Sequence, residues 1–438
     1  MKINEFGLIK EWIGRYRQNS NFTRMVTILS MDILARLSNI LLLPVYLRLM
    51  SQEEYGLYNY ILSIITTFSI VLNFGLYVAQ TKYYSDRHAG EGRKAVLFNI
   101  FFLLTLLLMI VLIPVYVFGI DFRLVKFLFK NDIGYSGFRW SMLMATIVSI
   151  YSVILANYFV TSERIHLFRK YNLYRLIVIN AVVLFCLYYF KSEKIHVRLF
   201  YTYLCEMLVL LVFISFYIRE MLPVIDKKLI VNSLKLGLPI MLSAVWAMIG
   251  NYNDKFFLEK YGSPKELSYY YLAFSIANIV YMICLAVQNS WLPSFLREKD
   301  LQLNIRKTKQ VITRLALGLL ILGVMLVLAF YLALKFRIIA DKYAPALLIL
   351  PFLLLAQIIS GIVLLYSNYL IYFEKTHWSM MVGIITSIIG LTGSYFLVSA
   401  WGIYGAVFSY LAVQLIYLFF YHRLIQYQLR RMVAKLII

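Results

Sequence analysis

Long apolar runs alternate with short polar turns along almost the whole chain. Cutting the sequence at the polar turns leaves twelve apolar runs of 19 to 27 residues. An α-helix rises about 1.5 Å per residue, so each run is long enough to cross about 30 Å of bilayer hydrocarbon. The pattern therefore predicts an all-α polytopic membrane protein. The predicted transmembrane helices lie near residues 25–48, 56–82, 96–119, 138–160, 172–190, 197–218, 235–258, 267–292, 311–334, 346–372, 378–399 and 402–422.

The composition agrees with a membrane protein. Hydrophobic residues make up 62% of the 438 residues, the mean hydropathy is +0.76 and 15% of residues are charged, which is too apolar for a soluble globular domain. The loops are short, and the longest on the predicted outer side runs from about 120 to 137. The first apolar run is a full crossing without a small-residue cleavage site after it, so we expect a retained span. Before it, Trp12 and Ile13 predict an apolar face lying on the membrane surface.

The net charge of +22 arises mainly from short loops between apolar runs. Lys and Arg number 26 on the side of the predicted amino terminus and 13 on the opposite side. The positive-inside rule then predicts both termini in the cytoplasm, and we expect the chain in the cytoplasmic membrane. Cations in such loops meet anionic lipid head groups, so we expect anionic membrane lipids as partners and no nucleic acid.

The two halves of the chain share matching residues at one spacing. YLRLMSQEEYGLYNYILSII begins at Tyr46 and resembles FLEKYGSPKELSYYYLAFSIA, which begins at Phe257. NYFVTSERIH begins at Asn157 and resembles NYLIYFEKTH, which begins at Asn368. The offset is 211 residues, or 212 after one inserted residue. A general likeness of apolar sequences does not explain the matching polar residues, so we predict a duplicated chain.

Each predicted copy has six spans, which leaves both copies facing the same way across the membrane. We therefore predict two parallel six-helix lobes around a central cavity, related by an axis along the membrane normal. The N-terminal lobe is expected over 1–218, a cytoplasmic connecting loop over 219–234, and the C-terminal lobe over 235–438.

The sequence does not favour cofactor or metal chemistry. It contains no phosphate-binding G-x-x-x-x-G-K-[ST] loop, and no catalytic residues are predicted. The histidines form no metal-ligand motif and are expected near span ends, and the cysteines are expected to be inert packing residues. They are His88, His166, His196, His377 and His422, and Cys186, Cys205 and Cys284.

Polar residues at membrane depth are the candidates for function, because an ionisable group there is costly and usually faces water, a substrate or a partner. On the first span Asp32, Arg36 and Asn39 share one helical face, although an Asp32–Arg36 pair could simply neutralise itself. On the seventh span Asp254 and Lys255 are adjacent and are expected to diverge in direction, so mutual neutralisation is not favoured. Lys255 could also extend to the outer interface.

Further polar residues interrupt other spans. Lys82 closes the second span, where an interfacial role and a substrate role are both open. Glu206 has apolar sequence neighbours and is a candidate, with Asp32, for binding a coupling proton or sodium ion. For the buried amides, hydrogen bonding between helices is the alternative to substrate binding. The predicted substrate-binding residues are Arg36, Asn39, Lys82, Asn251, Asp254, Lys255, Gln288 and Asn368.

The sequence resembles the polysaccharide transporter family of lipid-linked oligosaccharide flippases, which includes O-antigen-type flippases. The resemblance is carried by LSNILLLPVYLRLMSQEEYGLYNYILSI, FSIVLNFGLYVAQTKYYSD, the Lys235 hairpin and GIYGAVFSYLAVQLIYLFF. It implies two six-helix lobes, switching between inward-open and outward-open states, and an undecaprenyl-diphosphate-linked repeat unit as cargo. It also implies cationic cavity residues, here Arg36, Lys82 and Lys255, and a polysaccharide polymerase and chain-length proteins as partners in surface polysaccharide biosynthesis.

Two other functions remain open from the sequence. An exporter of drugs or small metabolites of the major facilitator type would also have two parallel six-span halves, although the SDRHAGEGRK loop has the wrong spacing for that class. A membrane glycan polymerase or ligase would share this composition, but such enzymes normally need a larger outer loop. We therefore expect a non-enzymatic transporter.

Overall fold

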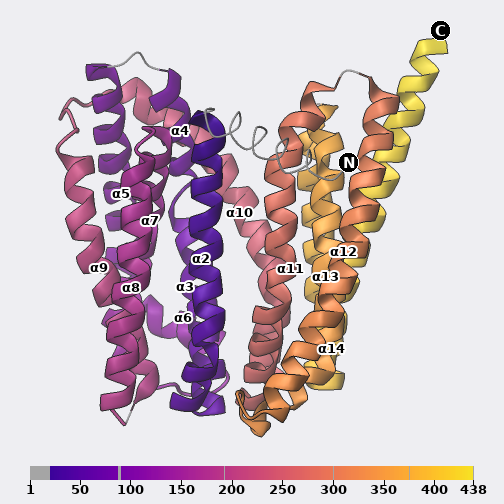
Figure 1. Ribbon diagram of the computed structural model, residues 1–438. Coiled ribbons are helices and arrows are strands. Elements are labelled where there is room, and N and C mark those ends of the chain that lie inside the picture. The colour runs from indigo at the N-terminus through magenta and orange to yellow at the C-terminus, as the bar shows by residue number, and fades with distance from the viewer. Residues whose placement is uncertain (1–19, 87–89, 192, 299, 374, 438) are drawn as a thin grey trace, which may run out of the picture. The chain divides into compact units, whose positions relative to one another are not determined.

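The computed structural model describes residues 20–86, 90–191, 193–298, 300–373 and 375–437, and within these ranges the chain is almost entirely helical (Figure 1). The helices are α2 (Ser20–Leu49), α3 (Gln52–Leu72), α4 (Leu76–Asp86), α5 (Glu91–Val117), α6 (Ile120–Leu128), α7 (Tyr135–Thr161), α8 (Ile165–Tyr189), α9 (Lys194–Ile218), α10 (Lys227–Tyr261), α11 (Pro264–Arg297), α12 (Leu301–Lys335), the 3₁₀-helix η1 (Asp341–Tyr343), α13 (Pro345–Tyr372) and α14 (Thr376–Ile437). Ten of them are long and apolar enough to cross a membrane. The prediction of an all-α multi-pass membrane protein is confirmed.

All twelve predicted spans fall on helices, but the structure departs from the prediction at two places. The predicted span 56–82 is wrong as a single helix, because the chain breaks between α3 and α4 at residues 73–75. Phe74 and Gly75 have φ of 53° and 67°, and the Asn73 side chain accepts a hydrogen bond from the Tyr77 N–H at 3.2 Å, which caps α4. The second departure is α6, a short helix inside the predicted outer loop.

The last two predicted spans form the two parts of α14. Gly402 lies at the predicted boundary and has φ 55° and ψ −128°, a conformation that favours glycine. The N–H of Ile403, which follows the break, donates to Glu266 Oε1 at 3.3 Å. The start of the final helical segment is therefore held by a side chain from α11.

The chain divides into two compact units. The first unit takes Met1–Leu42, Leu72–Met109 and Trp140–Leu238, and the second takes Leu43–Val71, Ile110–Arg139 and Pro239–Ile438. The second unit therefore combines most of the second half of the chain with two segments from the first half. The repeat boundaries at 218 and 235 and the central cavity stay predictions.

In the second unit, α3 and α11 begin with the same local structure. Ser51 Oγ accepts from the Glu54 N–H at 3.1 Å, and the Ser51 N–H donates to Glu54 Oε2 at 2.8 Å. At α11, Ser263 and Glu266 form the same reciprocal pair at 3.2 and 2.8 Å. Both are capping boxes, which satisfy N–H groups that a helix start leaves open. The serines and the glutamates are each 212 residues apart, so matching residues of the repeat perform the same task.

The two capped helices also pack closely on one another. A Cβ atom added at Gly56 on α3 would lie 2.7 Å from the Pro264 carbonyl oxygen and 2.8 Å from the Ser268 nitrogen. Both are backbone atoms, so no side-chain rotation could relieve the overlap. Further along, Ser63 Oγ and Tyr271 OH are 2.8 Å apart. The absence of a side chain at Gly56 is therefore what permits this contact between α3 and α11.

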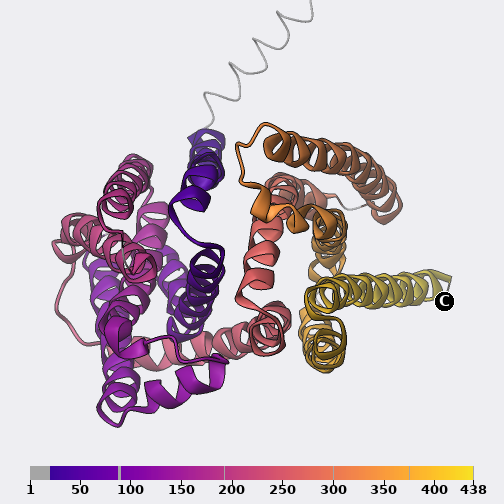
Figure 2. The same cartoon turned by 90° about the horizontal axis from the view of Figure 1, so that it is seen from below.

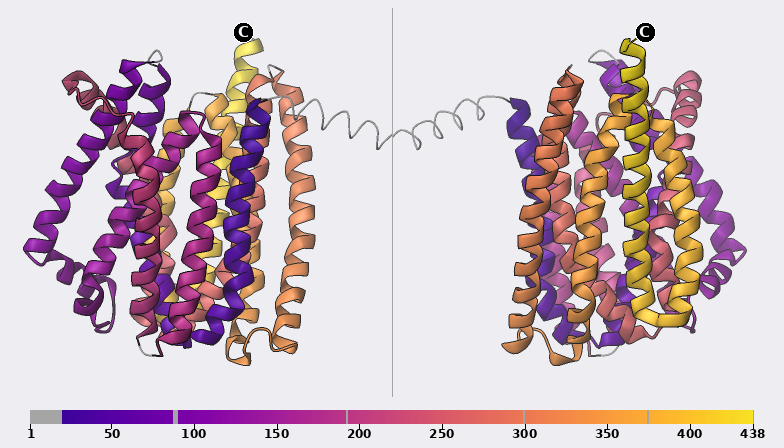
Figure 3. Two further views of the ribbon diagram at one scale, coloured as in Figure 1. Left: turned by 60° about the vertical axis from the view of Figure 1, so that its left-hand side comes forward. Right: turned by 90° about the vertical axis from the view of Figure 1, so that its right-hand side faces the viewer.

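In the second unit, α13 lies against both α11 and α14 (Figure 2 and Figure 3). Buried Leu350, Leu353 and Ala356 lie on α13, which packs against both other helices. Gly361 of α13 lies against Cys284 of α11, and a Cβ at Gly361 would overlap the Cys284 Sγ and lie 2.6 Å from its Cβ. The three cysteines are buried and free. Small residues of this kind let helices approach closely within a membrane.

Gly361→Ala should destabilise the protein by about 1–3 kcal/mol, because the added methyl group overpacks the α11–α13 contact. Cys284→Ala in the same chain should recover part of the loss, since it removes Sγ but leaves Cβ. Gly383→Ala on α14 is the matched control, because a Cβ there would meet nothing within 4 Å. Equilibrium unfolding in mixed micelles gives the free energy of unfolding of the Gly361→Ala, Gly361→Ala/Cys284→Ala and Gly383→Ala chains. Equal effects at positions 361 and 383 would contradict the close contact.

Candidate functional site

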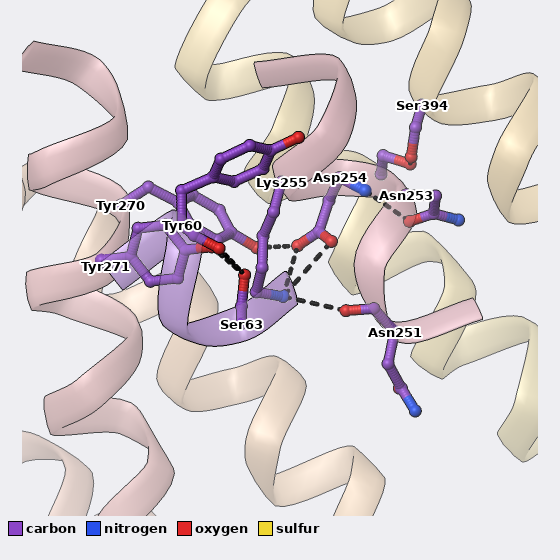
Figure 4. Close-up of polar contacts among 10 residues, drawn as sticks. Tyr60, Ser63, Asn251, Asn253, Asp254, Lys255, Tyr270, Tyr271 and Ser394 are labelled. Atoms are coloured by element: carbon purple, nitrogen blue, oxygen red, sulfur yellow. Dashed lines mark hydrogen bonds and ion pairs between the residues drawn. The ribbon is translucent and has the colours of Figure 1, made fainter. Parts of the chain in front are cut away.

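A buried charged pair lies near the C-terminal end of α10 (Figure 4). The Lys255 side chain is 7% exposed and that of Asp254 is fully buried, and Lys255 Nζ lies 3.3 Å from both carboxylate oxygens of Asp254. Lys255 Nζ also donates to the Asn251 carbonyl oxygen at 3.0 Å. The expectation that these adjacent side chains diverge is therefore wrong. The long Lys255 side chain turns back toward the preceding helical turn, which brings its ammonium group beside the neighbouring carboxylate.

Aromatic side chains from two other helices surround this pair. The Tyr270 hydroxyl on α11 donates to Asp254 Oδ2. Lys255 Nζ lies 4.4 Å from the centre of the Phe274 ring and 5.7 Å from those of Tyr270 and Tyr410. Such rings attract a cation through their negative faces. Three helices, α10, α11 and α14, therefore enclose one charged group of each sign in the interior of the second unit, which we call the Lys255 cluster.

The Lys255 cluster includes a polar group without a partner. Asn253 is 4% exposed, and its Oδ1 accepts from the Asp254 N–H at 2.6 Å. Its Nδ2 has no hydrogen-bond partner among the described residues. Asn251, by contrast, is exposed. The predicted residues Asn251, Asp254 and Lys255 thus lie together, and only the last two are buried.

Glu206 belongs to a second buried network, in the first unit. It is 2% exposed, and its Oε1 lies 2.8 Å from Arg175 Nη2 and accepts from Ser152 Oγ at 3.0 Å. The Tyr171 hydroxyl donates to Ser152 Oγ at 2.9 Å. Glu206 has apolar neighbours in the sequence, but α7 and α8 supply polar partners that are distant in sequence. Its role in ion coupling stays a prediction.

Gln288 and Asn368 bond to each other across α11 and α13. Gln288 Nε2 donates to Asn368 Oδ1 at 2.5 Å, and Asn368 Nδ2 donates to Gln288 Oε1 at 2.9 Å. Both residues are buried. The alternative of hydrogen bonding between helices therefore holds for this pair, and a role in substrate binding stays a prediction.

Two predicted cations remain. The structure describes the side chain of Lys82 but not that of Arg36. Lys82 on α4 is exposed, with its Nζ 5.8 Å from the centre of the Tyr83 ring. Asp32, Arg36 and Asn39 lie on α2, but their side chains fall outside the described residues. The possible Asp32–Arg36 pair therefore stays a prediction.

Tyr270, Phe274 and Tyr410 were not identified from the sequence. The only signal was that Tyr270 matches Tyr58 in the repeat, and both are buried. Among the residues that the structure describes, no three His, Cys, Asp or Glu side chains gather as metal ligands. Two apolar cavities, of about 560 and 360 Å³, lie between α12 and α13 and between α13 and α14, and no predicted site residue lines either.

The helices that are long and apolar enough to cross a membrane, with charged clusters buried among them, define a multi-pass α-helical membrane protein. The family model "Polysaccharide biosynthesis protein" matches residues 24–299. The chain therefore belongs to the polysaccharide biosynthesis protein family.

Solved structures show the same fold. A structure titled "Lipid II flippase MurJ, inward closed conformation" has a TM-score of 0.72 at 16% identity, covering 90% of this chain and 86% of that one. An inward-facing multidrug resistance MATE family transporter of the MOP superfamily has a TM-score of 0.57 at 13% identity, covering 90% and 98%. The outward-facing form has a TM-score of 0.58 at 14% identity, covering 94% and 95%. A comparison with curated protein sequences finds no match.

Asp254→Asn and Lys255→Met should each destabilise the protein by about 3–5 kcal/mol, because each leaves the partner charge buried without its counter-ion. The double variant should lose much less than the sum, since no unpaired charge remains. Equilibrium unfolding in mixed micelles gives the four free energies of the cycle. Additive losses would mean that the two side chains do not depend on one another.

Proposed function

We propose that the protein is a flippase that moves an undecaprenyl-diphosphate-linked oligosaccharide repeat unit across the cytoplasmic membrane by alternating access. The family match over residues 24–299 carries this proposal, because it ties the chain to polysaccharide biosynthesis. The fold shared with a lipid II flippase is consistent with a lipid-linked cargo. A transporter of this kind forms and breaks no covalent bond in its cargo, so the protein is proposed not to be an enzyme.

The proposed binding chemistry pairs cations with the diphosphate and amides with the sugars. Arg and Lys side chains offset phosphate charge, and amides and tyrosines bond hydroxyl groups. Lys255 is already paired with Asp254 at 3.3 Å, so binding a diphosphate requires its ammonium group to exchange one anion for another. The ammonium group itself needs little further desolvation in such an exchange, because it is already away from water, and the released Asp254 carboxylate keeps the hydrogen bond from the Tyr270 hydroxyl. Arg36, Lys82 and the amides of Asn39 and Asn251 are the other proposed contacts.

In the proposed alternating-access cycle, the second unit supplies the closed end. Beside the Gly56 contact between α3 and α11, two bonds join the α2–α3 turn to the segment between α12 and α13: Arg48 Nη2 donates to the Arg337 carbonyl at 2.9 Å, and Gln52 Nε2 donates to the Lys342 carbonyl at 2.6 Å. Side-chain bonds to carbonyl oxygens can be replaced by bonds to water when two helices part. In the proposed cycle these contacts separate to open the outer side.

The same proposal includes a cellular setting. Both termini face the cytoplasm, a proton or sodium ion binds at Asp32 or Glu206 to drive transport, and a polymerase and chain-length proteins use the product. These elements rest on the charge distribution of the loops and on the family resemblance.

Deleting the gene should cause the lipid-linked precursor to accumulate, and the wild-type chain should restore surface glycan. The Asp254→Asn/Lys255→Met chain should fail to restore it, with export reduced at least tenfold at equal protein level, because the exchangeable cation is gone. The control is Glu298→Gln/Lys307→Gln, which removes another carboxylate–ammonium pair, 2.7 Å apart in this structure, at the exposed start of α12. Lipid extracts and surface glycan are measured in each strain.

Two outcomes would contradict the proposal. Full export by the Asp254→Asn/Lys255→Met chain would remove the Lys255 cluster from the mechanism. An unchanged precursor level together with altered drug tolerance would favour the drug exporter, and sugar transfer by the purified protein without a membrane would favour the polymerase.

A further inference from the structure

Helix α6 carries an apolar surface although it is too short to cross a membrane. Its nine residues extend roughly 14 Å. Phe122, Leu124 and Phe127 are 44%, 39% and 65% exposed, and the cations Arg123 and Lys126 are exposed beside them. The helix connects α5 with α7, both of which are long and apolar enough to span a bilayer, so it lies where two spans end. Apolar and cationic side chains together at this level are typical of helices that lie in a membrane interface.

The start of α6 is held in a fixed orientation. Asp121, which is 4% exposed, receives two bonds from Arg139, at 2.5 Å from Nε and 3.0 Å from Nη2. The Tyr135 hydroxyl adds a third at 2.9 Å. Since this acid is neutralised by Arg139, it does not offset the charges of Arg123 and Lys126.

The end of α6 is held by other helices of the second unit. The Tyr60 hydroxyl on α3 donates to the Leu128 carbonyl at 2.8 Å, and Lys260 Nζ on α10 donates to the Phe129 carbonyl at 2.8 Å. The Lys130 N–H donates to both carboxylate oxygens of Glu259 at 2.9 Å. Carbonyl groups at a helix end need such donors. Both ends of α6 are thus fixed, and the exposed face between them keeps one direction.

We propose that this face of α6 docks on the membrane surface, with Leu124 and Phe127 among the lipid chains and Arg123 and Lys126 bound to anionic phospholipid head groups. Charge complementarity favours anionic phospholipid as the partner of this face. Two exposed cations flank the apolar side chains, and the one acid within the helix, Asp121, is paired with Arg139. Residues at the end of α6 are bonded to α3 and α10, so lipid bound to α6 helps to hold these two helices in position. This inference does not depend on which cargo the protein carries.

The test places a spin label on α6 in the full-length chain, reconstituted in phosphatidylcholine vesicles with increasing phosphatidylglycerol. The native cysteines are replaced by alanine, and single cysteines are introduced as Leu124→Cys, Phe127→Cys or Asn131→Cys. Collisions with oxygen should exceed those with a water-soluble nickel chelate at 124 and 127, and the reverse should hold at 131. The depth at 124 and 127 should increase with the anionic lipid fraction.

Arg123→Gln/Lys126→Gln should weaken the preference for the anionic lipid roughly 25-fold, since each cation near the surface is worth about fivefold. Lys191→Gln/Lys335→Gln, which removes two exposed cations predicted on the same side, should leave it unchanged. Labels at 124 and 127 that meet the nickel chelate in every vesicle would overturn the proposal. So would labels shielded from both reagents, which would mean that protein covers the face, or a depth that does not respond to phosphatidylglycerol.

Discussion

The lack of water in the bilayer core is the constraint on which this structure depends. A polar group placed there is costly unless it finds a partner within the chain, because solvent cannot supply one. Asp254 has Lys255 and Tyr270, Glu206 has Arg175 and Ser152, and Gln288 has Asn368. Each set joins side chains from two or three helices. The polar groups that give the protein its candidate chemistry therefore also decide which helices lie beside one another.

The repeat gives a second level of organisation, in which equivalent residues keep a structural task while the chemistry diverges. The capping boxes at α3 and α11 are built from serines and glutamates at the same spacing. Asn157 and Asn368 also both bond to a preceding helix, at the Tyr77 carbonyl and at Gln288. The Lys255 cluster has no such counterpart, since Arg48 and Pro44 occupy nearby positions of the first half. The residues that match between the halves therefore serve the scaffold, and the charged site belongs to one half alone.

The spans could be predicted because apolar length is a local property, and even Gly402 lies at the predicted boundary. Asn73 and Gly75, which lie within an apolar run, indicate the break at residues 73–75. The run is long enough for one span, so a single helix was predicted there. The pairing of Asp254 with Lys255 could not be predicted from their adjacency. It depends on Tyr270, Phe274 and Tyr410, which other helices bring to the same place. Glu206 and Arg175 were both visible as intramembrane charges, and only the fold joins them.

Glu266 serves the starts of two helices with one carboxylate. Oε2 accepts from the N–H and the hydroxyl of Ser263, and Oε1 accepts from the N–H of Ile403, 137 residues away. A shorter side chain at this position would remove a hydrogen bond from both helix starts at once. The turn that opens α11 and the bend within α14 therefore cannot vary independently, and any sequence change tolerated at one must remain compatible with the other.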